Sequence, residues 1–289
     1  MEKGLVISLK YGVYEVKIED KIFEVKARGA LKKHHKLPIV GDHVLVNLEE
    51  KMIEDVENRR SLLKRPNIAN LDQILLVFSL REPSFSYFLA LKYITYANKY
   101  DIKTILILSK CDKDVPLEEI NRIREDFKKI GIESYMTSTK TKEGLEEVST
   151  LFKDKITSLV GQSGVGKSSL LNALEPRFKR KEGSYSEALG RGRHETKETV
   201  LLEYKDGYIA DTPGFSSLDL ELYKEEIAKF FPGMNKLYTD CYFHDCLHLS
   251  EKKCAIKKAL EEGNIPQAIY DNYVKLVNDA LPYNRRYDV

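Results

Sequence analysis

The nine residues Gly161 to Ser169, which read GQSGVGKSS, decide how the central part of the chain folds. They match the pattern G-x-x-x-x-G-K-[ST], in which Lys167 and Ser168 occupy the last two positions. The apolar run ITSLV at 156–160 precedes the motif and SSLLNALE continues it, so the motif joins an expected strand to an expected helix. This context predicts a phosphate-binding loop.

The residue types of this loop explain its chemistry. Glycines let the backbone curl so that several N–H groups converge on a phosphate at a helix N-terminus, which already favours anions. Lys167 is expected to reach the β- and γ-phosphates, and the Ser168 hydroxyl is expected to ligate Mg²⁺. The predicted phosphate-binding residues are Gly161, Gln162, Ser163, Gly164, Val165, Gly166, Lys167, Ser168 and Ser169.

A second motif lies upstream, at the end of a buried apolar strand. The stretch SKCD resembles the guanine-reading pattern [NT]-K-x-D, and the ends of strands are where open α/β sheets bind ligands. A carboxylate at Asp112 would accept two hydrogen bonds from guanine and reject adenine, which lacks that donor pair. Ser109 is shorter than the usual Asn or Thr, which predicts weaker nucleotide affinity. The residues of this loop are Ser109, Lys110, Cys111 and Asp112.

The next strand end carries TSTK, at the place where GTPases put a loop against guanine O6. We therefore add Ser138, Thr139 and Lys140 to the predicted guanine site.

Two further elements lie downstream of the phosphate loop. DTPG at 211–214 is a D-x-x-G element, so Asp211 and Gly214 are expected to sense Mg²⁺ and the γ-phosphate. The glycine-bearing segment 177–198 reads as a switch loop, in which Thr196 is the candidate Mg²⁺ ligand. Phe215 stands where Ras-like enzymes place a water-orienting glutamine, so we expect slow intrinsic turnover. His194 is the candidate residue for positioning water, and Lys167 is the second candidate catalytic residue.

The order of these elements is reversed relative to an ordinary GTPase, because the base-reading loops precede the phosphate loop. In this order, and in the stretch GRGRHET at 190–196, the chain resembles the circularly permuted GTPases that act on the small ribosomal subunit, the RsgA/YjeQ type. Glu195 departs from that family's G-R-H-T-T pattern. The resemblance covers essentially the whole chain and implies an OB-fold, a permuted GTPase domain and a zinc domain.

The expected architecture is multidomain. Five short β-prone runs in residues 1–66 predict a small barrel, an OB-fold with an SH3-like barrel as the rival. Alternating apolar strands and helices in 67–222 predict the α/β GTPase domain, and 223–289 reads as a mainly helical zinc-binding domain. The segment LKKHHK at 31–36 reads as a basic loop that could contact nucleic acid.

Three of the four cysteines fall between 241 and 254, which favours a metal site over disulfides. Cys241, Cys246, His248 and Cys254 offer three thiolates and one imidazole, the composition of a closed structural zinc site. His244 is the rival fourth ligand by spacing, and the family resemblance favours His248.

Taken with the resemblance, these features predict a GTPase that binds the 30S subunit and its rRNA, hydrolyses GTP to GDP, and uses one structural Zn²⁺ with Mg²⁺ on the nucleotide. A net charge of only +2 requires any RNA contact to come from local patches. We expect a cytoplasmic monomer without membrane segments. The alternatives are a signalling GTPase with a protein effector and a GTP-gated RNA-binding module. Because the permuted chain leaves the switch region directly for its C-terminal part, we expect γ-phosphate loss to be transmitted there.

Overall fold

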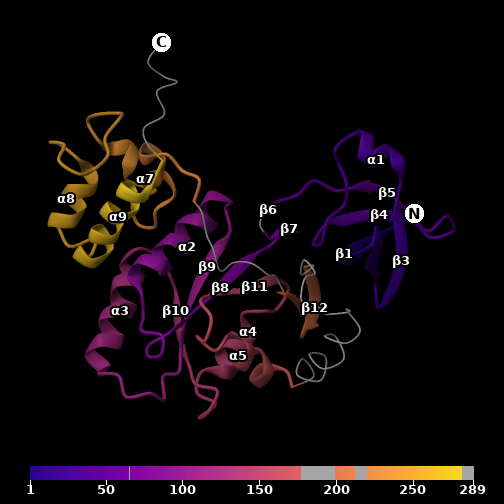
Figure 1. Ribbon diagram of the computed structural model, residues 1–289, viewed down its shortest axis with the longest axis horizontal. Coiled ribbons are helices and arrows are strands. Elements are labelled where there is room, and N and C mark those ends of the chain that lie inside the picture. The colour runs from indigo at the N-terminus through magenta and orange to yellow at the C-terminus, as the bar shows by residue number, and fades with distance from the viewer. Residues whose placement is uncertain (65, 177–198, 212–219, 282–289) are drawn as a thin grey trace. The chain divides into compact units, whose positions relative to one another are not determined.

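The computed structural model describes residues 1–64, 66–176, 199–211 and 220–281 (Figure 1). The chain forms two compact units whose segments interleave along the sequence. The first unit contains residues 1–75, 145–160 and 167–215, and the second contains 76–144, 161–166 and 216–289. The three-domain division expected from the sequence stays a prediction.

A five-stranded barrel opens the first unit. Strand β1 pairs with β2 and with β4, β2 pairs with β3, β3 with β5, and β5 with β4, so the barrel closes on itself. Val16, Val46 and Ile53 are among the fully buried residues that fill it. The expected OB-type barrel is confirmed. Its strands are β1 (Glu2–Lys10), β2 (Val13–Ile18), β3 (Lys21–Ala27), β4 (His43–Asn47) and β5 (Met52–Val56).

One sequence expectation in the barrel is wrong in part. The basic segment 31–36 does not form a loop throughout, because its first residues belong to helix α1 (Gly29–Lys33). Leu31 of this helix is buried in the barrel core, and the next two residues, Lys32 and Lys33, are exposed to solvent.

The first unit also contains strands from the centre of the chain. Strand β11 (Ile156–Val160) pairs in parallel with β13 (Gly207–Asp211), which forms an antiparallel hairpin with β12 (Val200–Tyr204). A bulge between Val6 and Ser8 lets β1 leave the barrel register and pair with β12 through Ser8 and Val200. The unit is completed by the hairpin β6 (Leu62–Lys64) and β7 (Asn67–Ala69), and by helices α4 (Leu145–Thr150) and α5 (Lys167–Leu174).

The second unit is an α/β layer with helices at its C-terminal part. Strand β8 (Gln73–Ser79), which begins in the first unit, is buried along its whole length, as its continuous apolar sequence predicts. Beside it, β9 (Lys103–Ser109) pairs in parallel with β10 (Ser134–Thr137), and helices α2 (Tyr87–Lys99) and α3 (Leu117–Lys129) provide the connections.

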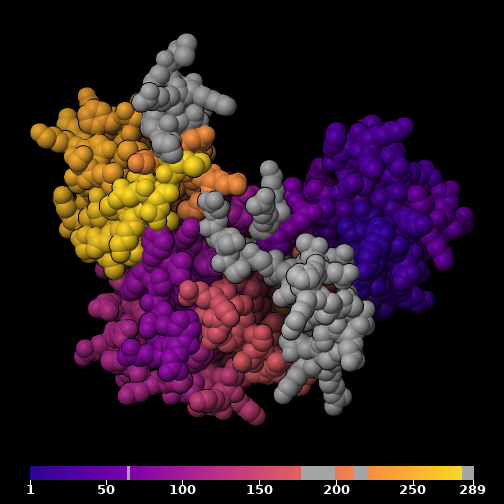
Figure 2. All heavy atoms as spheres, viewed as in Figure 1, coloured from indigo at the N-terminus to yellow at the C-terminus, as the bar shows by residue number. Residues whose placement is uncertain are grey.

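Residues 220–281 are mainly helical, as expected. The helix α9 packs on α2, where Figure 2 shows the yellow C-terminal surface against the purple one. No helix in the described ranges has the length and apolar character needed to cross a membrane. The elements are η1 (Lys224–Glu226), α7 (Ile227–Phe230), η2 (Tyr238–Asp240), α8 (Ala255–Glu261) and α9 (Gln267–Asp279).

Candidate functional site

The glycines of the loop after β11 are required by its geometry. Gly161 has no room for a side chain, because a Cβ there would lie 2.2 Å from the carbonyl oxygen of Val77. Gly164 and Gly166 have φ angles of 80° and 102°, which only glycine adopts without strain. The backbone therefore makes the sharp curl that a phosphate-binding loop needs.

Helix α5 begins at Lys167, directly after this loop. Lys167 is half-buried, and this partial burial lowers the pKa of its ammonium. Ser168 and Ser169, at the next two positions, are exposed. The first turn of the helix therefore presents two hydroxyls and one partly desolvated cation, groups that can bind phosphate and its metal ion.

Two residues of the base-reading motif hold the phosphate loop in place. The buried Ser109 hydroxyl lies 2.6 Å from the carbonyl oxygen of Val165 and 3.2 Å from that of Phe78. The Lys110 ammonium donates to the carbonyl oxygen of Gly164 at 2.9 Å and to that of Glu82 at 2.6 Å. The motif thus connects two loops of the second unit that are distant in sequence.

The second base-reading loop holds the Asp112 carboxylate. Thr137 and Ser109 are partners in the parallel ladder of β9 and β10, so the loops after them lie at one edge of the sheet. The Ser138 hydroxyl donates to Asp112 Oδ1 at 2.7 Å, and the Lys140 ammonium lies 3.6 Å from Oδ2. The hydrogen bond from Ser138, together with the nearby Lys140 charge, lowers the pKa of Asp112, so the carboxylate is ionised and serves as an acceptor.

Ser138 is itself fixed. It is fully buried, and its hydroxyl oxygen accepts hydrogen bonds from the backbone N–H groups of Lys140 and Thr141, both at 3.2 Å. Thr139 lies between Ser138 and Lys140 in the same turn.

Sequence reasoning missed two residues that support these loops. Glu82 offers a carbonyl oxygen to Lys110, and Glu143 offers one to the Ser138 backbone N–H at 3.1 Å. The Glu143 carboxylate also lies 3.6 Å from the thiol of Cys111, and burial, with this negative charge, raises the pKa of that thiol to about 11. Backbone acceptors leave no signature in a sequence, so no pattern could have identified them.

For four predicted site residues, Asp211, His194, Thr196 and Gly214, the structure does not describe the side-chain surroundings. Asp211 ends β13, which runs parallel to β11 in the first unit, so it lies at the same end of this strand pair as Val160, the last residue of β11. His194, Thr196 and Gly214 lie outside the described residues, as does Phe215.

A second candidate site is the cluster of Cys241, Cys246, His248 and Cys254, whose ligand atoms all lie within 4.8 Å of one another. Cys241 Sγ and Cys254 Sγ are 3.8 Å apart, and each lies 3.4 Å from His248 Nδ1. A tetrahedron built with Zn–S bonds of about 2.3 Å has edges of about 3.8 Å, so the donor set fits a zinc ion. The rival ligand His244 is exposed and does not belong to the cluster.

The surroundings of the cluster fix its loops. The Tyr270 hydroxyl donates to the carbonyl oxygen of His248 at 2.7 Å, and the Tyr273 hydroxyl donates to that of Leu247 at 3.0 Å. The Glu251 carboxylate accepts hydrogen bonds from three backbone N–H groups of the loop. Burial lowers the pKa of His248 and raises that of Cys246 to about 12, so the imidazole is neutral and metal binding must release a thiol proton.

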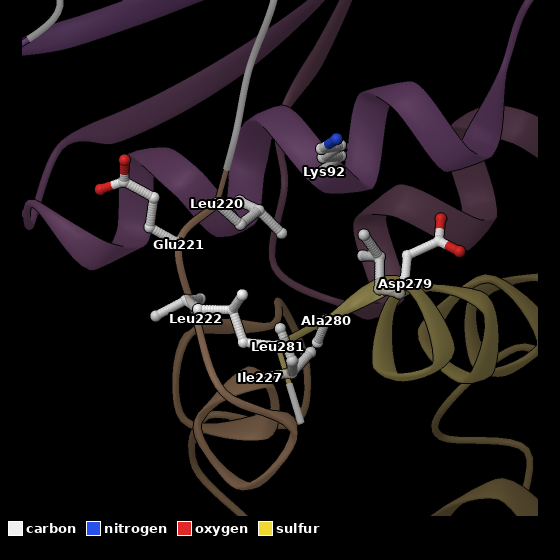
Figure 3. A pocket seen from close by; sticks show the side chains of 9 residues that line it. Lys92, Leu220, Glu221, Leu222, Ile227, Asp279, Ala280 and Leu281 are labelled. Atoms are coloured by element: carbon white, nitrogen blue, oxygen red, sulfur yellow. The ribbon is translucent and has the colours of Figure 1, made fainter. Parts of the chain in front are cut away.

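A third arrangement joins helix α2 to the residues that follow the D-x-x-G element. The Lys99 ammonium donates to the carbonyl oxygens of Leu220 and Glu221, at 3.0 and 3.3 Å, and the Asn98 amide donates to that of Phe230 at 2.8 Å. A small cavity of about 60 Å³ lies beside this contact. Figure 3 shows its lining, formed by Lys92, Leu220, Glu221, Leu222, Ile227, Leu276, Asp279, Ala280 and Leu281.

Two protein-family models match this chain, one over its N-terminal part and one over its nucleotide-binding part. Residues 56–221 match the RsgA GTPase family and residues 3–53 match the RsgA N-terminal domain. The chain is 37% identical to the small ribosomal subunit biogenesis GTPase RsgA of Halalkalibacterium halodurans, over 99% of both chains. It is 39% identical to the Bacillus subtilis protein of the same name, over 99% of this chain and 100% of the relative.

Two solved structures are similar along nearly the whole chain. YjeQ from Thermotoga maritima is 31% identical, with a TM-score of 0.82 over 96% of this chain and 98% of the other. YloQ, described as a circularly permuted GTPase, is 37% identical, with a TM-score of 0.80 over 96% of this chain and 94% of the other. The expected order of the nucleotide-binding elements is thus that of a known permuted fold.

Proposed function

Because the chain belongs to the RsgA family of GTPases, we propose that it hydrolyses GTP to GDP and phosphate on the small ribosomal subunit and assists the late maturation of that subunit. The observation that carries the proposal is the convergence of three loops in the second unit. The loop at 161–166 is bound by Ser109 and Lys110, the same SKCD loop presents the ionised Asp112, and Ser138 of the third loop donates to that carboxylate. The relatives named for this role are similar over their full length.

The nucleotide would be held by the two groups of loops. Asp112 accepts hydrogen bonds from the guanine edge, with Lys110 and the loop at 138–140 beside the base. The backbone N–H groups of 161–166 and Lys167 bind the phosphates. Asp211 and Gly214 take the positions that sense the γ-phosphate.

Two metal ions belong to this proposal. The Cys₃His cluster would hold one structural Zn²⁺, because its donor distances fit a closed tetrahedral site. Ser168 and Thr196 would hold Mg²⁺, which neutralises charge on the phosphates when bound.

Hydrolysis in this chain requires a residue other than the usual glutamine, because Phe215 cannot orient water. We assign that role to His194. An incomplete site in the free protein explains why the subunit should stimulate turnover, since a partner can supply a catalytic group or a cation. The basic residues at 31–36 and the RFKRK stretch at 177–181 are the proposed rRNA contacts, and the protein would act in the cytoplasm as a monomer.

In the permuted order, the chain runs from the D-x-x-G element into the C-terminal part, so a structural change caused by hydrolysis could be transmitted there. The backbone carbonyls of Leu220 and Glu221, six and seven residues after Gly214 of the D-x-x-G element, accept hydrogen bonds from Lys99, and the Leu281 N–H donates to the carbonyl oxygen of Leu222 at 3.1 Å. A change at the γ-phosphate would thereby reach the helices that surround the zinc cluster.

The deciding experiment is GTP turnover by the full-length protein with and without purified small ribosomal subunits, over a series of salt concentrations. We expect a strong acceleration that weakens at high salt, because phosphate contacts release counterions. Equal turnover with and without subunits would contradict the proposal.

A further inference from the structure

The zinc cluster presents an outward aromatic surface that the proposed GTPase cycle does not use. Tyr242 and Phe243 directly follow the ligand Cys241, and their side chains are 66% and 45% exposed. Their rings form an edge-to-face pair with centroids 5.0 Å apart. The Lys253 ammonium lies over the Tyr242 ring, 4.6 Å from its centroid. We refer to Tyr242, Phe243 and Lys253 as the aromatic face.

The aromatic face is held by the metal-binding loops. Tyr242 lies next to Cys241 and Lys253 lies next to Cys254, so each is adjacent to a candidate ligand. The Tyr242 N–H donates to the carbonyl oxygen of Lys253 at 3.3 Å, which joins the two loops. The Cys246 N–H donates to the carbonyl oxygen of Phe243 at 3.4 Å. The backbone that carries the rings is therefore fixed before any partner arrives, which lowers the entropy cost of binding.

The residues around the rings indicate the chemistry of the partner. Between the ligands, the exposed residues are Tyr242, Phe243, His244, Asp245, Ser250, Lys252 and Lys253, so lysines outnumber carboxylates among the exposed residues. The cores of protein–protein interfaces are depleted in lysine, whereas sites for single-stranded nucleic acid combine cations with open aromatic rings. Tyr242, with the Lys253 ammonium over its ring and Lys252 next to it, provides a surface for stacking a base and two cations for the phosphates on either side of that base.

We propose that the aromatic face stacks on an unpaired base of RNA, with Lys252 and Lys253 contacting the adjacent phosphates. The inference rests on the proposed function in one respect, which is that the RNA is that of the small ribosomal subunit. It assigns to the zinc cluster a role in recognition, because the metal orders the two loops that carry the rings and the cation.

The first test uses the fact that the chain contains no tryptophan. The variant Tyr242→Trp of the zinc-loaded, full-length protein has a single indole in the aromatic face. We expect a short single-stranded oligoadenylate to quench its emission saturably, and inorganic polyphosphate at the same ionic strength to leave the emission unchanged. No quenching by oligoadenylate, or equal quenching by both polymers, would overturn the proposal.

The second test measures affinity for intact small ribosomal subunits and for their naked RNA. The double variant Tyr242→Ala/Phe243→Ala should bind both at least about fivefold more weakly, because each lost base stack has an effect of that size or more. Zinc content and GTP affinity should not change. Leu117→Ala is the matched control, because Leu117 is also an apolar side chain with 73% exposure, on α3.

The outcomes separate the partner classes and the two proposals. Weaker binding to subunits with unchanged binding to naked RNA would mean that a ribosomal protein contacts this surface, and would overturn the inference. Unchanged affinity of the double variant for both ligands would also overturn it. If the unmodified protein does not bind subunits at all, the proposed function fails, while the oligoadenylate test still decides whether the face stacks on bases.

Discussion

The Ser109 hydroxyl lies 2.6 Å from the carbonyl oxygen of Val165, so the last residue of β9 is bound directly to the phosphate loop. Sequence comparison suggested that a serine at this position would weaken nucleotide binding, because it is shorter than asparagine or threonine. That expectation stays a prediction; in the structure the hydroxyl is buried and also lies 3.2 Å from the carbonyl oxygen of Phe78. The residue therefore positions the loop.

We predict that Ser109→Ala lowers affinity for GTP and GDP about tenfold, because it leaves the buried Val165 carbonyl without its donor, at a cost of ~1–3 kcal/mol. Titration with a fluorescent GDP analogue measures the effect. Thr104→Val is the matched control: Thr104 is buried on the same strand, and its hydroxyl has no hydrogen-bond partner in the described parts of the chain. Equal affinities for Ser109→Ala and the unmodified protein would contradict the positioning role.

Asp112→Asn should change the base preference. The amide oxygen can still accept the hydrogen bond from Ser138, so the loop should keep its shape, but the new amide donor faces a guanine edge that also donates. We expect the preference for GTP over xanthosine triphosphate to fall by about two orders of magnitude or more, measured by competition between the nucleotides. An unchanged preference would show that SKCD does not read the base.

His194→Ala should reduce subunit-stimulated turnover at least about tenfold and leave GTP binding intact, since a residue that positions water acts in the reaction step. Single-turnover hydrolysis on purified small subunits is the measurement. His43→Ala, which removes an exposed histidine from β4, is the control and should behave like the unmodified protein. Full stimulated turnover in His194→Ala would require another water-positioning group.

Zinc removal should loosen the C-terminal helices without unfolding the rest of the chain. A structural zinc ion contributes on the order of 10 kcal/mol to the folding of small modules. We expect one zinc per chain by metal analysis and faster hydrogen exchange in 241–254 after chelation. Cys246→Ser should lose the metal, whereas Cys111→Ser, which changes the one cysteine outside the cluster, should retain it. Zinc retained by Cys246→Ser would refute the ligand set.

Lys99→Met should weaken the connection between nucleotide state and the C-terminal part. The substitution removes the donor to the carbonyls of Leu220 and Glu221 and keeps most of the apolar stem. We expect the difference in subunit affinity between the GTP-bound and GDP-bound proteins to shrink severalfold, since these are hydrogen bonds from a charged donor. Lys92→Met on the same helix is the control, because Lys92 makes no hydrogen bond or ion pair in the described part of the chain. A preserved nucleotide dependence would exclude Lys99 as the link.

The parts of this fold that the sequence predicts are those with strong local patterns. The uninterrupted apolar residues of β8 and the alternating ones of β2 define their strands, and the GKS motif locates the start of α5. Helix α4 was not expected, because its short sequence LEEVST follows a glycine and carries little periodicity. The hairpin of β6 and β7 was likewise too short to predict.

For the site, the sequence predicts the roles of side chains but not their contacts with backbone groups. The residue types of Ser109, Lys110 and Asp112 predict a site that recognises the base. The hydrogen bonds from Ser109 and Lys110 to the phosphate loop could not be predicted, because their acceptors are backbone carbonyl oxygens, which every residue has. For the metal cluster, spacing allowed either His244 or His248, and only packing places the second inside and the first in solvent. Long-range geometry thus decided what local patterns left open.

The pairing of β1 with β12 has a consequence for any shortened form of this protein. Ser8 opposite Val200 places the barrel's first strand on the open side of the β12–β13 hairpin, and Lys17 forms an ion pair with Glu203 nearby. A chain that starts after the barrel would lose the β1 partner at Val200 and leave this side of β12 uncovered, and an unprotected edge strand can recruit other strands. We therefore expect the barrel to protect β12 from pairing with other chains, so that removing it to isolate the GTPase should yield a protein that self-associates through β12.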